Sequence, residues 1–184
     1  GGDPINGLNF SPMDISERTL NEIHLPPFKS AVNEGVFSIM AAHNEVNGIP
    51  SHSNKKLMSD LVRDHWGFNG FYVSDWLDIE RLETLHKVAR NFKEATHLAV
   101  DAGIDMHMHG PNFAESVVEL VNEGKLSKNR VNYACSKILE AKFKLGLFEN
   151  RYVDEDIISE KIFTESHTNT ALKLAREGIV LLKN

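Results

Sequence analysis

The sequence predicts an α/β protein with parallel strands, and three observations support this fold class. Short apolar runs of strand length alternate with stretches in which apolar residues recur every three or four positions, as in amphipathic helices. Three such strand–helix units follow one another along the chain. Because a strand that is reached through a helix normally lies parallel to the previous strand, this alternation favours a parallel sheet covered by helices.

The composition is that of an ordinary globular protein. Its 184 residues, 41% hydrophobic and 25% charged, suit one domain with a fragment of a second. Twenty Lys plus Arg against twenty-six Asp plus Glu give a net charge of -6, which argues against a nucleic-acid partner. No apolar run approaches the roughly 20 residues of a membrane span, so no membrane partner is expected. Cys135 is the only cysteine, which excludes an intrachain disulfide and a thiolate zinc cluster.

The first part of the chain is predicted to form a loop, two helical stretches and a strand. Residues 1–15 carry prolines and glycines with little periodicity, which indicates a loop. A helix is predicted to begin at an N-cap, Ser16, and to be interrupted at Pro26 and Pro27. A second helical stretch follows over 27–33. The apolar run 36–41 is then typical of a strand buried on both faces.

The middle of the chain repeats this alternation twice. A turn is predicted over 47–50 from its Asn-Gly and Pro residues. An amphipathic helix is predicted over 57–66 and a buried strand over 70–74. A further helix over 92–100 and a third strand over 104–108 complete the pattern.

The last part of the chain is predicted to be helical and then to change character. Apolar spacing indicates one helix around 117–121 and a longer one over 127–147. The segment 150–158 is acidic and polar, as in a linker, and a helix over 166–176 then leads into the apolar run 178–183. We expect this run to be the first strand of another module, because a buried strand cannot pair alone. Three strand–helix units are also too few for a closed parallel barrel, which needs eight strands and about 250 residues.

Polar groups that could carry chemistry follow each of the three predicted strands. They are His43–Asn44–Glu45, Ser74–Asp75–Trp76 and His107–Met108–His109, and ligands of parallel α/β proteins bind at such strand ends. The carboxylate of Asp75 beside an indole ring suits a sugar site, in which it could attack an anomeric carbon. The alternative is that Asp75 caps the next helix, and the pattern alone leaves both interpretations open.

The remaining candidate groups carry weaker signals. His107 and His109 would point to one side of a strand, as in some metal-dependent hydrolases, but a metal site needs three or four ligands and no further cluster accompanies them. Two carboxylates, Glu45 and Asp78, could act as a second acid, although such residues are more often caps or surface charges. The other histidines of the middle segment are expected at the surface: His52, His65, His86 and His97.

Seven segments in a fixed order carry a resemblance to a known family. These segments are Ser16–Phe28, Ser38–His52, Leu57–Trp66, Gly67–Trp76, Ala102–Met106, Lys142–Phe148 and Glu177–Asn184. Together they cover nearly the whole chain and resemble family 3 glycoside hydrolases of the β-glucosidase type.

The resemblance implies a (β/α)₈ TIM-type barrel followed by a linker and an α/β sandwich domain. Residues 1–149 would be the C-terminal part of the barrel, 150–165 the linker and 166–184 the start of the sandwich. The family's Lys-His pair and its other sugar-binding Asp and Arg would lie before residue 1, and its acid/base glutamate after residue 184. The chain would therefore need the rest of its own polypeptide, and the family favours a periplasmic or secreted location.

The resemblance also implies a reaction and its residues. It implies retaining hydrolysis of terminal non-reducing β-D-glucosyl residues, with Asp75 as nucleophile and with Trp76, His43 and Met40 binding the substrate. Many family members have tyrosine in place of His43, next to the nucleophile. The partner would be a β-linked oligosaccharide or glycoside, and no metal or other cofactor is expected. The alternatives are a β-xylosidase of the same family and a metal-dependent hydrolase that uses the His-x-His pair.

Overall fold

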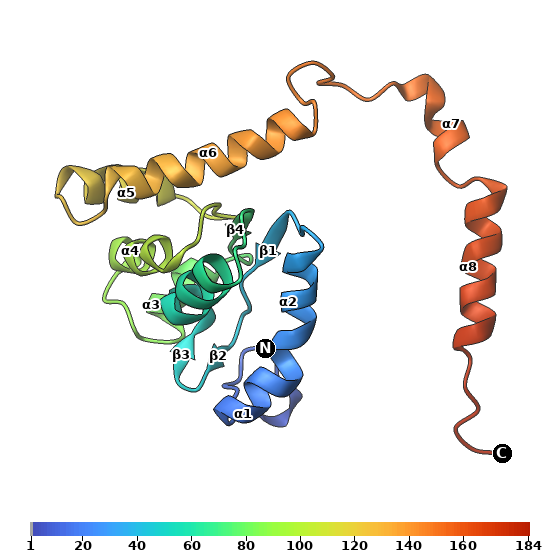
Figure 1. Ribbon diagram of the computed structural model, residues 1–184, viewed down its shortest axis with the longest axis horizontal. Coiled ribbons are helices and arrows are strands. Elements are labelled where there is room, and N and C mark those ends of the chain that lie inside the picture. The colour runs from blue at the N-terminus through green and yellow to red at the C-terminus, as the bar shows by residue number, and fades with distance from the viewer. Residues whose placement is uncertain (1) are drawn as a thin grey trace. The chain divides into compact units, whose positions relative to one another are not determined.

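The computed structural model describes residues 2–184, which form two compact units that divide between Lys144 and Leu145. The first unit is mixed α/β and mostly helical (Figure 1). Among the described residues, none of the helices combines the length and apolarity needed to cross a membrane. The elements of the first unit are η1 (Ile5–Gly7), α1 (Glu17–Thr19), η2 (Leu20–His24), α2 (Leu25–Asn33), β1 (Ser38–Met40), β2 (Glu45–Val46), β3 (Ile49–Pro50), η3 (Ser51–Ser53), η4 (Lys56–His65), β4 (Phe71–Val73), α3 (Asp78–Thr84), α4 (Phe92–Ala102), α5 (Phe113–Asn122) and α6 (Lys128–Lys144).

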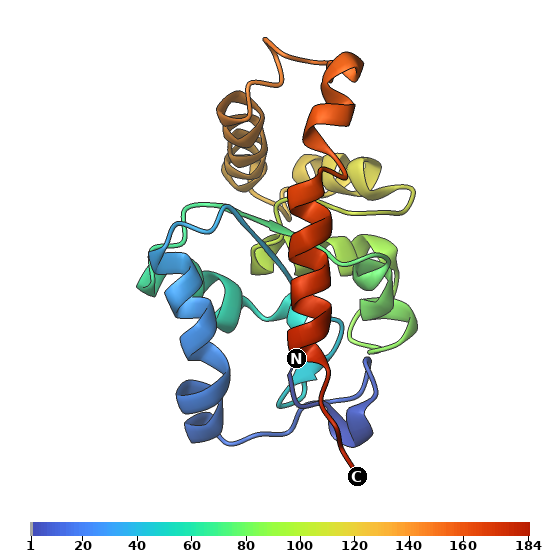
Figure 2. The same ribbon diagram turned by 90° about the vertical axis from the view of Figure 1, so that its right-hand side faces the viewer.

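The first helix runs without interruption through α1, η2 and α2, in blue in Figure 2. Its predicted N-cap is confirmed, because the hydroxyl of Ser16 accepts the N–H of Thr19 at 3.0 Å. The predicted break at Pro26 and Pro27 is wrong. The two prolines occupy the first turn of α2, directly after the wider π-helical turn η2. In this position the helix tolerates the missing N–H and the bulk of the proline ring.

The central pairing is parallel, as predicted, but the strands are shorter than predicted. β1 pairs with β4, with Ser38 opposite Phe71 and Met40 opposite Val73. The predicted third strand over 104–108 is reduced to one parallel bridge between Val73 and Met106. The pairing of β4 with this segment is short because the N–H of Tyr72 donates to the side chain of Asp105 at 2.8 Å. In a longer ladder this N–H would donate to a backbone carbonyl of the neighbouring strand.

The predicted turn at Asn47 and Gly48 closes a small antiparallel hairpin, β2–β3, whose strands were not predicted. Both turn residues have positive φ, 50° and 80°. Asn and Gly tolerate this left-handed conformation better than other residues, and it matches the twist of a tight hairpin. The hairpin carries the chain from the end of β1 toward η3 and η4.

The later helices follow the predictions with one omission and one shortened end. The helices η4, α4 and α5 lie where the apolar spacing places them, although η4 is π-helical. The helix α6 ends at Lys144, ahead of the predicted 147. The short helix α3 was not predicted, because its seven residues are too few to show a periodicity.

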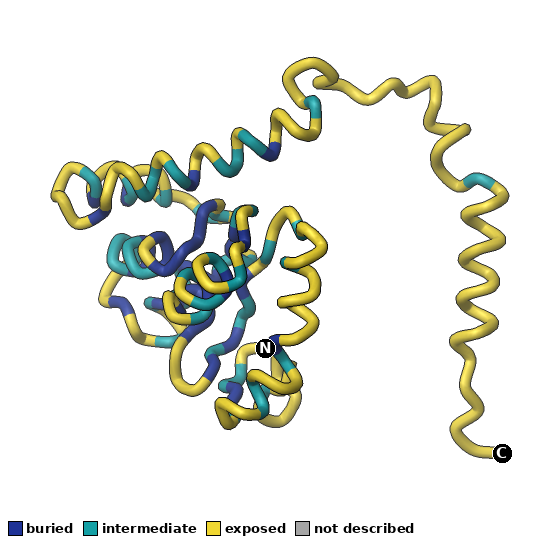
Figure 3. The backbone as a smooth tube through the Cα atoms, in the orientation of Figure 1, coloured by how far each residue is buried: buried dark blue, intermediate teal, exposed yellow. Residues whose placement is uncertain are grey.

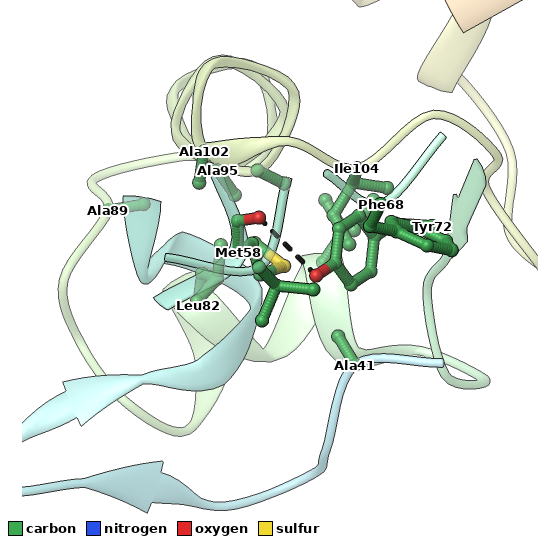
Figure 4. Packing of buried hydrophobic residues seen from close by; sticks show 12 residues of the cluster. Ala41, Met58, Phe68, Tyr72, Leu82, Ala89, Ala95, Ala102 and Ile104 are labelled. Atoms are coloured by element: carbon green, nitrogen blue, oxygen red, sulfur yellow. Dashed lines mark hydrogen bonds between the residues drawn. The ribbon is translucent and has the colours of Figure 1, made fainter. Parts of the chain in front are cut away.

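The core of the first unit lies between the parallel strands and the helices η4, α3 and α4 (Figures 3 and 4). Its buried residues are Ala41, Met58, Val62, Phe68, Tyr72, Ile79, Leu82, Ala89, Ala95, Ala99, Ala102 and Ile104. The phenol of Tyr72 donates to the carbonyl of Met58 at 3.3 Å inside this core (Figure 4). Gly70 is required before β4, because a Cβ there would come within 2.3 Å of the Phe37 carbonyl oxygen.

The second unit contains η5 (Glu155–Ile157), α7 (Ile158–Lys161) and α8 (Glu165–Gly178). The helix α8 confirms the predicted helix over 166–176, and its N-cap Thr164 accepts the N–H of His167 at 3.3 Å. The described residues after Gly178 form no strand, and the run over 178–183 as the first strand of another module stays a prediction. A strand exists only through its pairing, and no described residue of this unit offers a partner strand.

A buried ion network fixes the segment beside β4. The carboxylate of Asp105 is fully buried, and its Oδ2 accepts from Nη2 of Arg63 at 2.8 Å. Its Oδ1 lies 2.9 Å from Nη1 of Arg130, which also donates to the carbonyl oxygens of Val100 and Ile104. The network therefore joins η4, the start of α6 and the segment that flanks β4.

We expect Asp105→Ala to destabilise the protein much more than Asp101→Ala does. Removing Asp105 leaves two poorly exposed guanidinium groups without their carboxylate, a change that typically costs about 3–5 kcal/mol. Asp101 pairs with Lys55 at 3.0 Å, but both side chains are more than half exposed, so its loss should cost less than about 1 kcal/mol. Thermal unfolding of the complete protein measures both changes. Equal shifts of Tm would contradict this account.

Candidate active site

The candidate site lies at the edge of the sheet where β1 and β4 end. Because the two strands are parallel, their carboxyl ends meet at the same edge. His43 is the third residue after β1 and Asp75 is the second residue after β4. Asp78 opens α3, and His52 lies in the turn η3. The structure thus brings together residues from four different segments.

The carboxylate of Asp75 is held by its neighbours and still reaches solvent. Its Oδ2 lies 3.0 Å from Nε2 of His43, and its Oδ1 accepts the N–H of Trp76 at 2.6 Å. The backbone N–H of Asp75 donates to Nε2 of His52 at 3.0 Å. The side chain is 23% exposed, so a ligand can reach it.

The structure favours one of the two interpretations of Asp75. A helix cap would accept an N–H from the first turn of α3, whereas the side chain of Asp75 accepts from the adjacent residue Trp76. The N-cap of α3 is Leu77, which makes no side-chain capping bond. Asp75 is therefore placed as a strand-end carboxylate and not as the cap of α3.

The imidazole of His43 lies between two carboxylates. Its Nε2 faces Asp75, and its Nδ1 lies 2.7 Å from Oδ2 of Asp78. The side chain of Asp78 is only 1% exposed, and its Oδ1 accepts from Nη1 of Arg81 at 2.5 Å. The ring of Phe10 covers the imidazole at 4.7 Å between centroids. Both oxygens of Asp78 are thus used inside the protein.

The buried histidine His52 stays neutral at ordinary pH. Burial lowers the pKa of His52 from 6.5 to about 4, and the negative charges of Asp78 and Asp75 oppose that shift only in part. Because Nε2 of His52 accepts the N–H of Asp75, the single proton of the neutral ring is on Nδ1. His52 therefore acts here as a hydrogen-bond acceptor that fixes the backbone of Asp75.

The two histidines of the His-x-His pair do not converge on one point. His109 stacks on Trp76 with ring centroids 4.0 Å apart and planes 12° apart. His107 stacks on Phe113 at 4.5 Å, and burial lowers the pKa of His107. The geometry gives both rings aromatic partners, and only one of them, His109, reaches the candidate site through Trp76.

Met40 lies at the end of β1, but its side chain lines a pocket other than the candidate site. It lines an apolar pocket with Met13, Leu25 and Phe28, among other residues, and the lining of this pocket does not include Asp75. The side chain is half-exposed. The structure therefore does not bring Met40 into the cluster around Asp75, and its part in substrate binding stays a prediction.

Sequence reasoning misplaced several members of the cluster. His52 and His86 were expected at the surface, yet both side chains are buried. Asp78 was weighed as a cap or a surface charge, yet it is the most deeply buried carboxylate of the site. Arg81 was not singled out. One signal was present in the sequence, since Asp78 and Arg81 are three residues apart and such pairs meet on a helix.

One group of three residues within 2–184 has the spacing of a metal site: His43, Asp75 and Asp78, with one donor atom each within 4.8 Å of the others. His107 and His109 do not belong to it. A cation at this place would have to displace the bonds of His43 to both carboxylates. We assign no ion to it.

Comparison with known proteins identifies the family. The model of the glycosyl hydrolase family 3 N-terminal domain matches residues 2–141. A β-xylosidase of Formosa agariphila is 41% identical over 186 residues, which cover 97% of this chain and 26% of that protein. A periplasmic β-glucosidase of Salmonella typhimurium is 32% identical, with 97% of this chain and 24% of that protein covered.

Comparison with solved structures leads to the same family. A crystal structure of a β-glucosidase from Listeria innocua matches 100% of this chain and 25% of its own, with a TM-score of 0.93 and 34% identity. That enzyme has also been solved with glucose, and a mutant of it with laminaribiose. This chain therefore belongs to glycosyl hydrolase family 3. It spans about a quarter of the length of the curated relatives named above.

We expect His52 to make the protein less stable as the pH falls from about 6.5 to about 4. The unfolded chain binds a proton on His52 below pH 6.5, whereas the folded protein binds it only near pH 4. The resulting loss is about 3 kcal/mol at pH 4 and is complete only below that pH. Denaturant unfolding of the complete protein at pH 7 and pH 4 should show a smaller pH-dependent loss for His52→Gln. The exposed His65→Gln is the control, and a loss that is the same in all three proteins would contradict the assignment.

Proposed function

We propose that the complete protein is a retaining β-glycosidase that removes terminal non-reducing β-D-glucosyl residues, with Asp75 as its nucleophile. The observation that carries this proposal is the placement of Asp75: a partly exposed carboxylate at the end of β4, held by His43 and next to a half-exposed tryptophan. Membership of glycosyl hydrolase family 3 supports the class of reaction.

The proposed chemistry has two steps. In the first step, an oxygen of Asp75 bonds to the anomeric carbon while the bond to the leaving group breaks, and an acid outside this chain protonates the leaving oxygen. In the second step, water attacks the anomeric carbon, releases the sugar and restores the carboxylate. The contacts with Trp76 and His43 fix the orientation of the Asp75 carboxylate before the attack. This lowers the entropic part of the activation barrier.

Trp76 is proposed to bind the sugar at the reacting position. Its side chain is 52% exposed, and His109 covers one face of the indole. The other face would contact the C–H bonds of the sugar ring. The stack with His109 would restrict the indole to one orientation, which lowers the entropy lost when substrate binds.

The finer architecture is also a proposal. We propose that β1, β4 and the segment at Met106 belong to a (β/α)₈ barrel whose other strands lie elsewhere in the polypeptide. Their parallel pairing supports this, and so few strands cannot close a barrel alone. Residues 150–165 would then be a linker and 166–184 the start of the α/β sandwich domain.

The similarity to a β-xylosidase supports a second candidate substrate. The β-xylosidase of Formosa agariphila is 41% identical to this chain, whereas the matching Listeria innocua structures are of a β-glucosidase. A β-xyloside is therefore the alternative substrate. The two sugars differ by the hydroxymethyl group at C5.

We expect replacement of Asp75 to abolish turnover in the complete protein. Asp75→Ala should lower kcat by at least about 10³-fold, because it removes the covalent step. Added azide should restore part of the activity and give a glycosyl azide of inverted configuration. In the unaltered protein, a 2-deoxy-2-fluoro glycoside should label the peptide that contains Asp75, as read by mass spectrometry.

The exposed Asp64→Ala is the matched control, since it removes a carboxylate from the outside of η4. It should keep full activity and the same labelled peptide. Labelling of a different carboxylate, or an active Asp75→Ala protein without azide, would refute the assignment.

We expect the complete protein to prefer the glucoside. Its kcat/KM for an aryl β-D-glucoside should exceed that for the matching β-D-xyloside by about tenfold or more, which is the discrimination that a pocket achieves for one small group. Steady-state rates with the two nitrophenyl glycosides measure it. A preference of the same size for the xyloside would make the protein a β-xylosidase.

A further inference from the structure

Three apolar residues near Asp75 stay partly exposed, and each comes from a different segment. Phe10 belongs to the loop before α1, and Trp76 follows β4. Met108 lies two residues after Met106, which bridges to the end of β4. These three residues, which we call the apolar rim, are 40%, 52% and 36% exposed. Single exposed apolar residues are ordinary on a protein surface, whereas a group of them beside a site indicates contact with a ligand.

The two outer members of the apolar rim lie next to the immediate surroundings of Asp75. The N–H of Met108 donates at 2.9 Å to the hydroxyl of Ser74, the residue before Asp75. The ring of Phe10 lies 4.7 Å from the imidazole of His43, measured between centroids. Nε2 of His43 in turn lies 3.0 Å from the Asp75 carboxylate. The apolar rim is therefore continuous with the candidate active site.

The loop that carries Phe10 is fixed before any ligand binds. The guanidinium of Arg81 lies over the Phe10 ring, 4.4 Å from its centroid. Three residues further on, the N–H of Met13 donates to the carbonyl oxygen of Glu45 at 2.9 Å, and the Met13 side chain is buried. An apolar surface that is already ordered loses little entropy when a ligand covers it.

The sugar by itself does not account for Phe10 and Met108. A substrate has to reach Asp75, so the space beside this carboxylate must stay open in the complete protein. The sugar ring is assigned to the free face of the Trp76 indole, and its hydroxyl groups need polar partners. In a retaining reaction the nucleophile attacks opposite the leaving group, so the leaving group extends from the sugar toward solvent. There a flexible apolar group can fold onto the apolar rim.

We propose that the apolar rim binds an apolar leaving group, so that the complete protein acts on glycosides of apolar alcohols in preference to β-linked disaccharides. The inference rests on the proposed function and adds the chemical class of the leaving group. The reaction itself is unchanged: the bond from the anomeric carbon to the leaving oxygen breaks, this oxygen takes up the proton of the acid outside this chain, and the apolar alcohol departs.

The test uses the complete protein with the methyl, ethyl, butyl and hexyl β-glycosides of whichever sugar it prefers. The leaving alcohols of this series are almost equally acidic, so the chemical step stays nearly constant while the apolar surface grows. Complete burial of one CH₂ group corresponds to about a fourfold gain. Because the apolar rim leaves part of an alkyl chain in water, kcat/KM should rise about 1.5- to 2-fold for each added CH₂ group. A β-linked disaccharide of the same sugar should be a poorer substrate than the hexyl glycoside.

Two variants of the apolar rim should flatten this series. Met108→Gln keeps the length of the side chain and replaces the thioether by a polar amide, and Phe10→Ser removes the ring. Each should reduce the gain in kcat/KM from the methyl to the hexyl glycoside at least about threefold, because less apolar surface is buried. The methyl glycoside is the reference within each variant. A general loss of activity through His43 or Asp75 therefore cancels in this ratio.

Leu139→Gln is the matched control, because Leu139 is 41% exposed on α6 and a glutamine there also replaces an apolar side chain by an amide. Its series should follow that of the unaltered protein. A flat series in the unaltered protein, a disaccharide preferred to the hexyl glycoside, or an unchanged gain in both rim variants would overturn the inference. Failure of the proposed function is distinguished by the labelling experiment, which would then mark a residue other than Asp75. Thermal unfolding verifies that each variant is folded.

Discussion

The buried carboxylate of Asp78 is the constraint on which the arrangement of the site depends. An ionised group that is 1% exposed cannot be solvated, so its oxygens must be satisfied by protein donors. Arg81 supplies one donor from the next turn of α3, and His43 supplies the other from the end of β1. This requirement ties α3 to the strand end and turns the second nitrogen of His43 toward Asp75. The position of the partly exposed Asp75 thus depends on the buried carboxylate of Asp78, which a ligand does not reach.

A second buried carboxylate orders the opposite side of β4. Asp105 accepts the N–H of Tyr72 and pairs with Arg63, which keeps the following residues beside the strand. The hydroxyl of Ser74 then accepts the N–H of Met108 at 2.9 Å, and His109 continues to its stack on Trp76. Two internal aspartates therefore set the two flanks of Asp75, one through an imidazole and one through the backbone.

The imidazole beside Asp75 reaches two carboxylates at once, because its two nitrogens point in different directions. A tyrosine hydroxyl donates one hydrogen bond and ordinarily titrates near pH 10. A histidine carries a nitrogen on each of two sides of its ring, and both nitrogens can take part in hydrogen bonds. With Asp78 on its far side, His43 links the partly exposed carboxylate of Asp75 to a buried one, which the single oxygen of a phenol would not do.

The sequence by itself determined the parallel order of the strands, most helix positions, the Asn-Gly turn and the strand-end position of Asp75, because these depend on local periodicity and turn chemistry. It did not reveal that the first helix passes Pro26, since a π-helical turn ahead of a proline is a matter of backbone geometry. Only the tertiary structure decided that His52, Asp78 and His86 are buried partners of the site. Isolated polar residues carry no pattern of their own, and the donors that make their burial tolerable come from segments far apart in the chain.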